Sequence, residues 1–186
     1  MKIISLKKSK NISSLGAFKH YLFLLPVLFL ITNAFSKEII IEPGENAHER
    51  LQEAMILMSE GDVLLIKSGY YKFEDGLSLD VNQVTIVGEG MNETILDFQD
   101  QQSGAQGFLV TSDEVTLKDF AILDAKGDAL KVIGAKGINM INLRTEWTGG
   151  PKSTNGAYGF YPVESEDEVI ESSYEVEVDE EIEKEN

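Results

Sequence analysis

The sequence predicts an all-β protein, a right-handed parallel β-helix that forms a solenoid of about four coils with an N-terminal amphipathic capping helix. The main observation is a pattern between Leu77 and Met140 that returns roughly every 22 residues, a period typical of solenoids. The segments that begin at Val110 and Val132 share one order: an apolar strand end, a small residue, a short polar turn and a new alternating strand. In a solenoid, each coil buries its apolar face against its neighbours.

Residue types after Phe73 favour strands over helices. Val, Ile, Leu, Thr and Phe fill short segments, and Gly, Asn, Asp and Ser separate them. Leu77–Val87 contains an earlier copy of the repeat. Asp119 and Asn142 fall at equivalent places in successive copies, so we expect them to stack as a ladder of turn residues.

The segment before the repeats predicts one helix between two strands. Apolar residues at i, i+3, i+4 and i+7 form one stripe along this helix: Leu51, Ala54, Met55 and Met58. The expected order is a strand at Glu38–Glu42, a helix at Ala47–Glu60 and a strand at Val63–Lys67. Such a helix would cover the apolar end of the first coil, and a helix packed on an ordinary sheet is the alternative.

Capping residues are expected at both ends of this helix. Asn46 is a candidate N-cap, with Glu49 as its reciprocal partner three positions later. Gly61 is a candidate for the C-terminal cap.

Residues 1–36 have the pattern of a signal peptide. Five lysines precede the apolar run Tyr21–Ile31, and Ala34–Ser36 places small residues at the two positions that a signal peptidase recognises. We therefore expect cleavage before Lys37 and a periplasmic or secreted protein. An uncleaved N-terminal anchor is the alternative. The sequence contains no Cys, so disulfides are excluded.

The charge of the chain excludes several partners. Without the five leader lysines, 11 Lys and Arg face 32 Asp and Glu, a formal net charge of −21. This charge repels nucleic acid and anionic lipid, so we expect neither nucleic acid nor, after leader cleavage, a membrane as partner. Neutral ligands and anionic polymers bridged by cations remain compatible with it.

The composition changes after Val163. Residues 37–163 are expected to form the β-helix domain, whereas residues 164–186 form an acidic C-terminal tail that contains a partial last coil, with a strand at Tyr174–Val178. Two interpretations remain open. Either the tail covers and blunts the last coil, or the chain is the N-terminal part of a longer β-helix. In the second case, missing downstream coils or a partner would cover the C-terminal end.

A resemblance to a known family rests on Trp147–Pro151 and Asn155–Val163. Here the chain resembles bacterial exported parallel β-helix proteins of the pectin-lyase-like superfamily, which includes pectate lyases and alginate C5-epimerases. The resemblance covers most of Glu38–Val163. It implies the fold and a carbohydrate partner, a polysaccharide or oligosaccharide.

Tyr158–Val163 is similar to the Tyr-Gly-Phe-Asp-Pro-His motif of the alginate epimerases, whose Asp and His take part in proton transfer. In this chain, Tyr161 stands in the place of the Asp and Val163 in the place of the His. Proton abstraction beside a uronate carboxyl group needs a positioned base and an electrophile. The remaining catalytic candidates are Arg144, Tyr158 and Tyr161, and Glu146 could simply pair with the arginine. Lyases of the superfamily use Arg or Lys as the base.

The insertion Gly149–Gly159 lengthens one coil by about nine residues, and such loops carry binding sites. Aromatic rings in and beside it could form a sugar platform: Trp147, Tyr158, Phe160 and Tyr161. The alternative is that these rings only pack the loop on the coil.

No cofactor is expected, and no metal site. Calcium remains open as a ligand because aspartates are numerous, but none of their spacings matches a calcium loop. His48, in the first turn of the predicted helix, is interpreted as a surface residue. The preferred function is an exported carbohydrate-associated module that is non-catalytic on its own. The alternative is a lyase or C5-epimerase acting on uronate polymers such as alginate or pectin.

Overall fold

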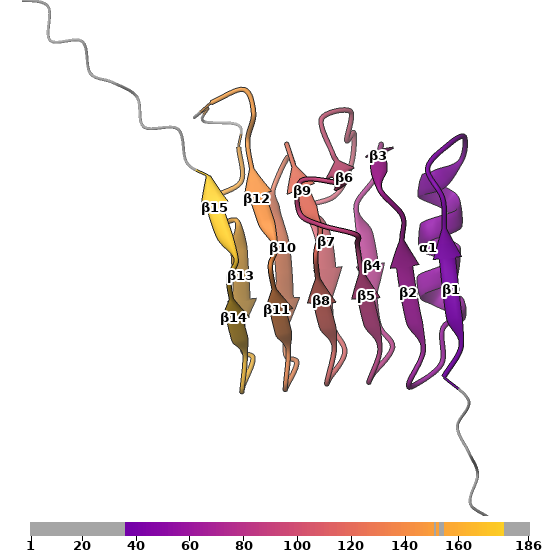
Figure 1. Ribbon diagram of the computed structural model, residues 1–186. Coiled ribbons are helices and arrows are strands. Elements are labelled where there is room, and N and C mark those ends of the chain that lie inside the picture. Colours follow the sequence, from indigo (N-terminus) through magenta and orange to yellow (C-terminus); the bar gives the residue numbers. More distant parts are fainter. Residues whose placement is uncertain (1–35, 151, 153–154, 177–186) are drawn as a thin grey trace, which may run out of the picture. The chain divides into compact units, whose positions relative to one another are not determined.

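The computed structural model describes residues 36–150, 152 and 155–176. They form a right-handed parallel β-helix, as the sequence predicts, in which the chain passes in turn through three parallel sheets (Figure 1). Sheet A contains β1 (Glu38–Ile41), β2 (Val63–Ile66), β5 (Thr85–Val87), β8 (Thr116–Lys118), β11 (Asn139–Ile141) and β14 (Val169–Glu171). Sheet B contains β3 (Gly69–Lys72), β6 (Thr94–Asp97), β9 (Ala121–Leu123), β12 (Arg144–Glu146) and β15 (Tyr174–Val176). Sheet C contains β4 (Leu77–Leu79), β7 (Gln106–Val110), β10 (Asp128–Ile133) and β13 (Phe160–Val163).

Each coil takes one strand from each sheet. The coils β2–β4, β5–β7, β8–β10 and β11–β13 are complete, and β14 and β15 continue the stack within the residues that the structure describes. About four coils were expected, and this number is confirmed. β14 and β15 lie in the segment that the sequence assigns to the acidic tail with its partial last coil.

The repeat period is less regular than the sequence predicts. Val110 pairs with Val132, one predicted period later, as expected. Leu79 pairs with Val110, however, and this separation is clearly longer than one period. Val132 pairs with Pro162 at a similarly long separation, which contains the predicted insertion Gly149–Gly159. In the coil β5–β7 the additional residues lie both between sheets A and B, at residues 88–93, and between sheets B and C, at residues 98–105. In the coil β11–β13 they lie between sheets B and C, at residues 147–159. A uniform period over Leu77–Met140 is therefore wrong, although the order of strands within a coil is right.

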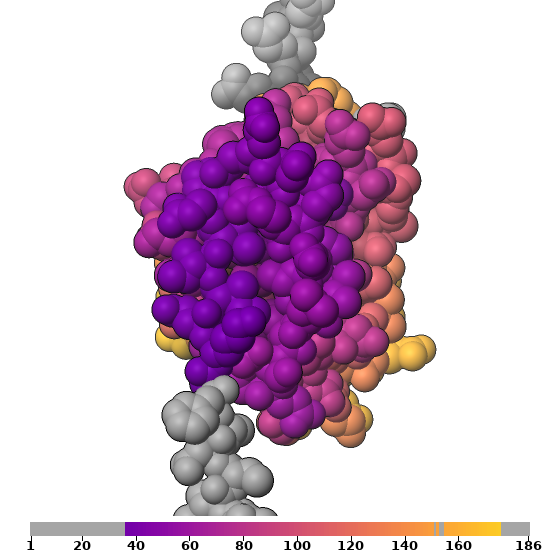
Figure 2. Space-filling view, turned by 90° about the vertical axis from the view of Figure 1, so that its right-hand side faces the viewer, coloured from indigo at the N-terminus to yellow at the C-terminus, as the bar shows by residue number. Residues whose placement is uncertain are grey.

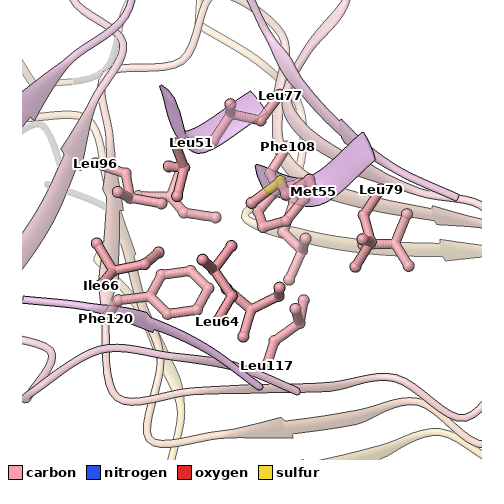
Figure 3. Packing of buried hydrophobic residues seen from close by; sticks show 14 of the residues in the cluster. Leu51, Met55, Leu64, Ile66, Leu77, Leu79, Leu96, Phe108, Leu117 and Phe120 are labelled. Carbon is pink, nitrogen blue, oxygen red and sulfur yellow. The ribbon is translucent and has the colours of Figure 1, made fainter. Parts of the chain in front are cut away.

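The core consists of stacked columns of apolar side chains inside the coils. Inward positions of successive strands lie in register, as in the column Ile86, Leu117 and Met140, and all three are fully buried. Figure 3 shows leucine, isoleucine and phenylalanine side chains from several coils meeting in one interior. Because each coil covers its neighbour, the stack forms a continuous core without disulfides.

Helix α1 (Ala47–Leu57) covers the N-terminal end of this core. Figure 2 shows this end of the molecule, where residues of β1 and α1 lie over the first coil. Leu51 and Met55 are almost fully buried and point into the same interior as Leu77 and Phe108 (Figure 3). The apolar stripe and the capping helix are thus confirmed.

The ends of α1 differ from the prediction. The helix stops at Leu57 rather than at Glu60, because Met58 adopts an extended conformation. Asn46 precedes the helix in the left-handed region, with φ of 53°, and makes no side-chain capping hydrogen bond, so the capping pair with Glu49 is wrong. Gly61, with φ of 89°, lies in the turn that leads to β2 and does not cap the helix.

Within the described residues, no helix has the length and apolar character required to cross a membrane.

Candidate functional site

Two of the four aromatic residues that the sequence singles out, Tyr158 and Tyr161, lie at the outer surface of sheet C. β13 pairs in parallel with β10 (Figure 1). In this register, Tyr161 lies directly beside Lys131. The neighbouring residues Leu130 and Val132 are fully buried and point into the coil. Because successive side chains of a strand alternate between faces, Lys131 and Tyr161 project outward.

Tyr158 and Tyr161 form a stacked pair on this surface. Their ring centroids are 4.4 Å apart and their planes differ by 20°. Tyr158 is 49% exposed, so part of the pair is open to solvent. A flat, partly exposed aromatic surface with phenol hydroxyls at its edge is suited to stacking against a sugar ring and bonding its hydroxyls.

Lys131 adds a positive charge to the tyrosine pair. Its Nζ lies 4.9 Å from the centroid of the Tyr161 ring, which is the geometry of a cation–π contact. The same Nζ lies 3.6 Å from a carboxylate oxygen of Asp128. We refer to Asp128, Lys131, Tyr158 and Tyr161 together as the sheet C cluster.

Phe160 lies between these outward tyrosines but faces the other way. It pairs with Leu130, which in turn pairs with Phe108, and both of these residues are fully buried. Phe160 is half-buried and packs against the core. This position supports the alternative interpretation, in which the Phe160 ring packs on the coil and anchors β13. It does not support the predicted contact of Phe160 with a sugar.

Trp147 also belongs to the core. It is only 8% exposed, and its indole N–H donates a hydrogen bond of 2.7 Å to the carbonyl of Ala125. A buried indole whose one donor is satisfied presents no open face to a ligand. Trp147 therefore anchors the loop after β12 to the preceding coil, and it has no place in the sheet C cluster.

Arg144 lies on a different sheet from the tyrosines. It is the first residue of β12 in sheet B, and its guanidinium forms an ion pair with Glu146. A second, long hydrogen bond of 3.4 Å runs from Arg144 Nη2 to the carbonyl of Met91. Arg144 and Glu146 are both half-buried. Of the three catalytic candidates, the fold brings Tyr158 and Tyr161 together and places Arg144 on another sheet. There Arg144 pairs with Glu146, which is the alternative role that the sequence suggests for it.

Neither a metal site nor a catalytic histidine emerges from the described residues. No group of three or more His, Asp or Glu side chains that could hold a metal ion occurs among them. His48 lies on α1, and its ring contacts Phe73 edge-on at 5.1 Å. Val163, at the place of the epimerase histidine, pairs with Ile133 at the end of β13.

Lys131 is a member of the sheet C cluster that is absent from the residues predicted from the sequence. The lysine precedes Tyr161 by more than one predicted period, so the expected repeat does not align the two. The available signal was the alternation in Ala129–Ile133, where the only charged residue falls on the outward face. Adding the predicted insertion Gly149–Gly159 to one period places Lys131 beside Tyr161, so the sequence contains the information needed to align the two.

Comparisons with known proteins support the fold. No protein-family model and no curated protein matches the chain. Among solved structures, the chain is similar to one described as the PL6 family alginate lyase AlyGC, with a TM-score of 0.52 and 19% identity over 73% of this chain and 20% of the lyase. A structure of a pectin methylesterase in complex with a hexasaccharide matches with a TM-score of 0.40 and 13% identity, over 60% of this chain and 48% of that one.

These findings define the class of the protein by its fold. The chain is a parallel β-helix, the fold that its sequence predicts and that its similarity to the alginate lyase supports. The chain spans about one fifth of the length of the alginate lyase.

Proposed function

We propose that this chain is an exported, carbohydrate-associated β-helix module that binds an acidic polysaccharide at the sheet C cluster. The observation that carries the proposal is the stacked pair Tyr158 and Tyr161 beside Lys131 on the outer surface of one sheet. The tyrosines offer an apolar ring surface for a pyranose, and the lysine offers a cation for a uronate carboxylate. The fold shared with an alginate lyase makes a uronate polymer the first ligand to test.

The proposed module is non-catalytic on its own. The epimerase-like motif carries Tyr161 and Val163 where that family has its Asp and His. Arg144, the predicted lyase-type base, is paired with Glu146 on another sheet. The sheet C cluster therefore combines binding groups without a histidine or an unpaired carboxylate to move a proton.

The enzyme alternative rests on the contact between Lys131 and Tyr161. A phenol could serve as a base or an acid in β-elimination or C5 epimerisation of a uronate, and the neighbouring ammonium group of Lys131 could stabilise the charge that develops on the uronate. In elimination, a base removes the proton at C5, a C4–C5 double bond forms, and the glycosidic oxygen leaves. The missing site residues would lie on coils outside the described ones.

The C-terminal end of the described stack offers a second surface. Val169, Ile170 and Tyr174 are between 41% and 49% exposed there. In β15, Glu175 lies in register with the buried Thr145 of β12, so a charged residue stands at this inward position of the last strand. We propose that a further coil, from downstream residues or a partner, covers these side chains.

A binding experiment tests the proposed function. Oligosaccharides of mannuronate, guluronate and galacturonate are titrated into the chain that begins at Lys37, and the heat of binding is measured by calorimetry. Tyr158→Ala and Lys131→Ala should each weaken binding at least about tenfold, which corresponds to about 1.4 kcal/mol. Tyr70→Ala is the matched control, because Tyr70 is 57% exposed on sheet B. Equal losses in the control, or no binding of any oligomer, would contradict the proposal.

The same samples distinguish the enzyme alternative. Formation of unsaturated sugar ends would demonstrate lyase activity, and deuterium incorporation at C5 in heavy water would demonstrate epimerase activity. Either activity in this chain, lost in Tyr161→Phe, would replace the non-catalytic proposal.

A further inference from the structure

Lys37 is held in the fold by both of its backbone groups. Its N–H donates a hydrogen bond of 2.8 Å to Oδ1 of Asp62. Its carbonyl accepts a hydrogen bond of 2.9 Å from the amide of Val63, at the start of β2. The side chains of Ser36 and Lys37 are exposed, so what the fold fixes at this point is the main chain.

Asp62 is a buried carboxylate that the neighbouring turn holds in place. It is only 5% exposed. Oδ2 accepts a hydrogen bond of 2.9 Å from the amide of Ser59, and the amide of Asp62 donates to the Ser59 carbonyl at 3.0 Å. The hydrogen bonds from Ser59 and Lys37 lower the pKa of the Asp62 carboxyl group below its ordinary value, so it is ionised at neutral pH.

The nitrogen that contacts this carboxylate is the one that leader cleavage would release. The small residues Ala34 and Ser36 predict cleavage between Ser36 and Lys37. Hydrolysis of this peptide bond adds one water molecule, leaves a carboxylate on Ser36 and leaves an α-ammonium group on Lys37. Two independent observations, the pattern recognised by the peptidase and the contact with Asp62, thus involve the same atom, the backbone nitrogen of Lys37.

We propose that Asp62 is a binding site for the new N-terminus of the processed chain. Cleavage before Lys37 replaces a single neutral N–H donor with a positively charged group that carries three hydrogens, and the fold already holds this nitrogen within hydrogen-bond distance of an ionised carboxylate. Leader removal thereby converts a charge-assisted hydrogen bond into an ion pair. The inference is independent of the carbohydrate proposal.

The position of the cut determines whether this ion pair forms. The hydrogen bond from the peptide N–H to the ionised Asp62 is already charge-assisted, and cleavage adds to it the attraction between two unit charges at a carboxylate that is shielded from water. A chain that begins one residue earlier keeps the peptide N–H of Lys37, but its ammonium group lies up to about 3.8 Å further along the chain. A chain that begins one residue later loses the donor. Cleavage before Lys37 therefore gives the most stable N-terminus of the three.

The ion pair also predicts the behaviour of the α-amine in solution. An opposite charge within hydrogen-bond distance favours the protonated amine, so the pKa of the Lys37 α-amine should lie above its ordinary value. An α-amine exposed to water would keep its ordinary pKa. This difference separates an ion pair from a backbone hydrogen bond that only shapes the turn, since the latter leaves the amine pKa unchanged.

The experiment uses the full chain, expressed with its leader and purified after export. Mass spectrometry of the purified protein should show Lys37 as the first residue, and any other first residue would overturn the proposal. The α-amine is then labelled with a limiting amount of an amine-reactive reagent at several pH values, and the labelled N-terminal peptide is quantified. Asp62→Asn should raise the labelling rate near neutral pH about tenfold, the effect of one pKa unit.

A double-mutant cycle controls for damage to the turn. The unfolding midpoint in urea is measured for the wild type and Asp62→Asn, each with a free and with an acetylated α-amine. Acetylation keeps the N–H and removes the charge, so Asp62→Asn should cost more stability in the free-amine pair than in the acetylated pair. Equal costs in both pairs, together with a labelling rate that does not depend on Asp62, would show an ordinary hydrogen bond and overturn the proposal.

Discussion

The side-chain amide of Asn142 donates a hydrogen bond of 2.7 Å to the carboxylate of Asp119, one coil away in the stack. Both residues lie in the short turn between sheet A and sheet B, and both have positive φ, 62° at Asp119 and 52° at Asn142. Their backbones also stack, since the Asp119 amide donates to the Ile141 carbonyl at 3.1 Å. The ladder expected from the equivalent sequence positions is therefore confirmed. Asp and Asn suit this turn because their short polar side chains tolerate the left-handed region.

The ladder makes a prediction about Asn142. Asn142→Ala loses the side-chain bond and places Ala in the left-handed region, so we expect a loss of about 1–3 kcal/mol in unfolding free energy. Asn142→Gly loses the same bond but adopts positive φ without strain, and should cost less. Urea denaturation of both variants measures the difference. A glycine variant less stable than the alanine variant would contradict this account of the turn.

Val110 and Val132 provide a test of the stacked core. They pair in adjacent coils and both are fully buried. Val132→Asp would bury a carboxylate without a partner, so we expect a loss of about 4 kcal/mol or more, or failure to fold. The matched control is Ile133→Asp, at the next position of the same strand, where the side chain is 37% exposed. Thermal and urea unfolding should show a much smaller effect for the control.

The fold was predictable because a solenoid repeats local information. Inward valines and leucines, turn residues such as Asp119 and the apolar stripe of α1 are each visible in a short stretch of sequence. The variable coil length was not predictable in the same way. The connections between strands can lengthen without changing the strands, because buried residues such as Phe98 and Trp147 hold the start of each loop on the core while the added residues project from it.

The candidate site was predictable only in part. Tyr158 and Tyr161 were visible as neighbours in sequence, but their contact with Lys131 depends on the register between β10 and β13, across a long loop. The roles of Trp147 and Phe160 depend on which face of the coil each side chain occupies. Aromatic residues beside a loop are compatible with both a sugar platform and a packed anchor, and burial decides between them.

Trp147 should therefore behave as a structural residue. Trp147→Ala removes a large buried ring and should cost about 3–5 kcal/mol. Trp147→Phe keeps most of the ring volume but removes the indole N–H that donates a 2.7 Å hydrogen bond to the carbonyl of Ala125. This loss should lower the free energy of unfolding by about 1–3 kcal/mol. Both values come from urea unfolding followed by circular dichroism. If instead Trp147→Ala left stability unchanged and abolished sugar binding, the indole would belong to a ligand platform after all.

The role of calcium in ligand binding gives the last prediction. Between Lys37 and Val163, 10 basic residues face 20 acidic ones, and this charge alone would make an anionic polymer depend on bridging cations. The position of Lys131 beside the tyrosine pair changes that expectation, because the lysine can contact a uronate carboxylate directly.

We expect the affinity for a uronate oligomer to fall as salt is raised from about 50 to about 300 mM but to be unaffected by a chelator. Lys131→Ala should remove most of the salt dependence, whereas Lys136→Ala should not, since Lys136 pairs with Glu166 at 2.7 Å in the turn region. Calorimetric titrations with a uronate oligomer, in chelator and in millimolar calcium, measure both effects. Binding that requires calcium and is insensitive to Lys131→Ala would show that the cation, and not the lysine, bridges the polymer to the protein.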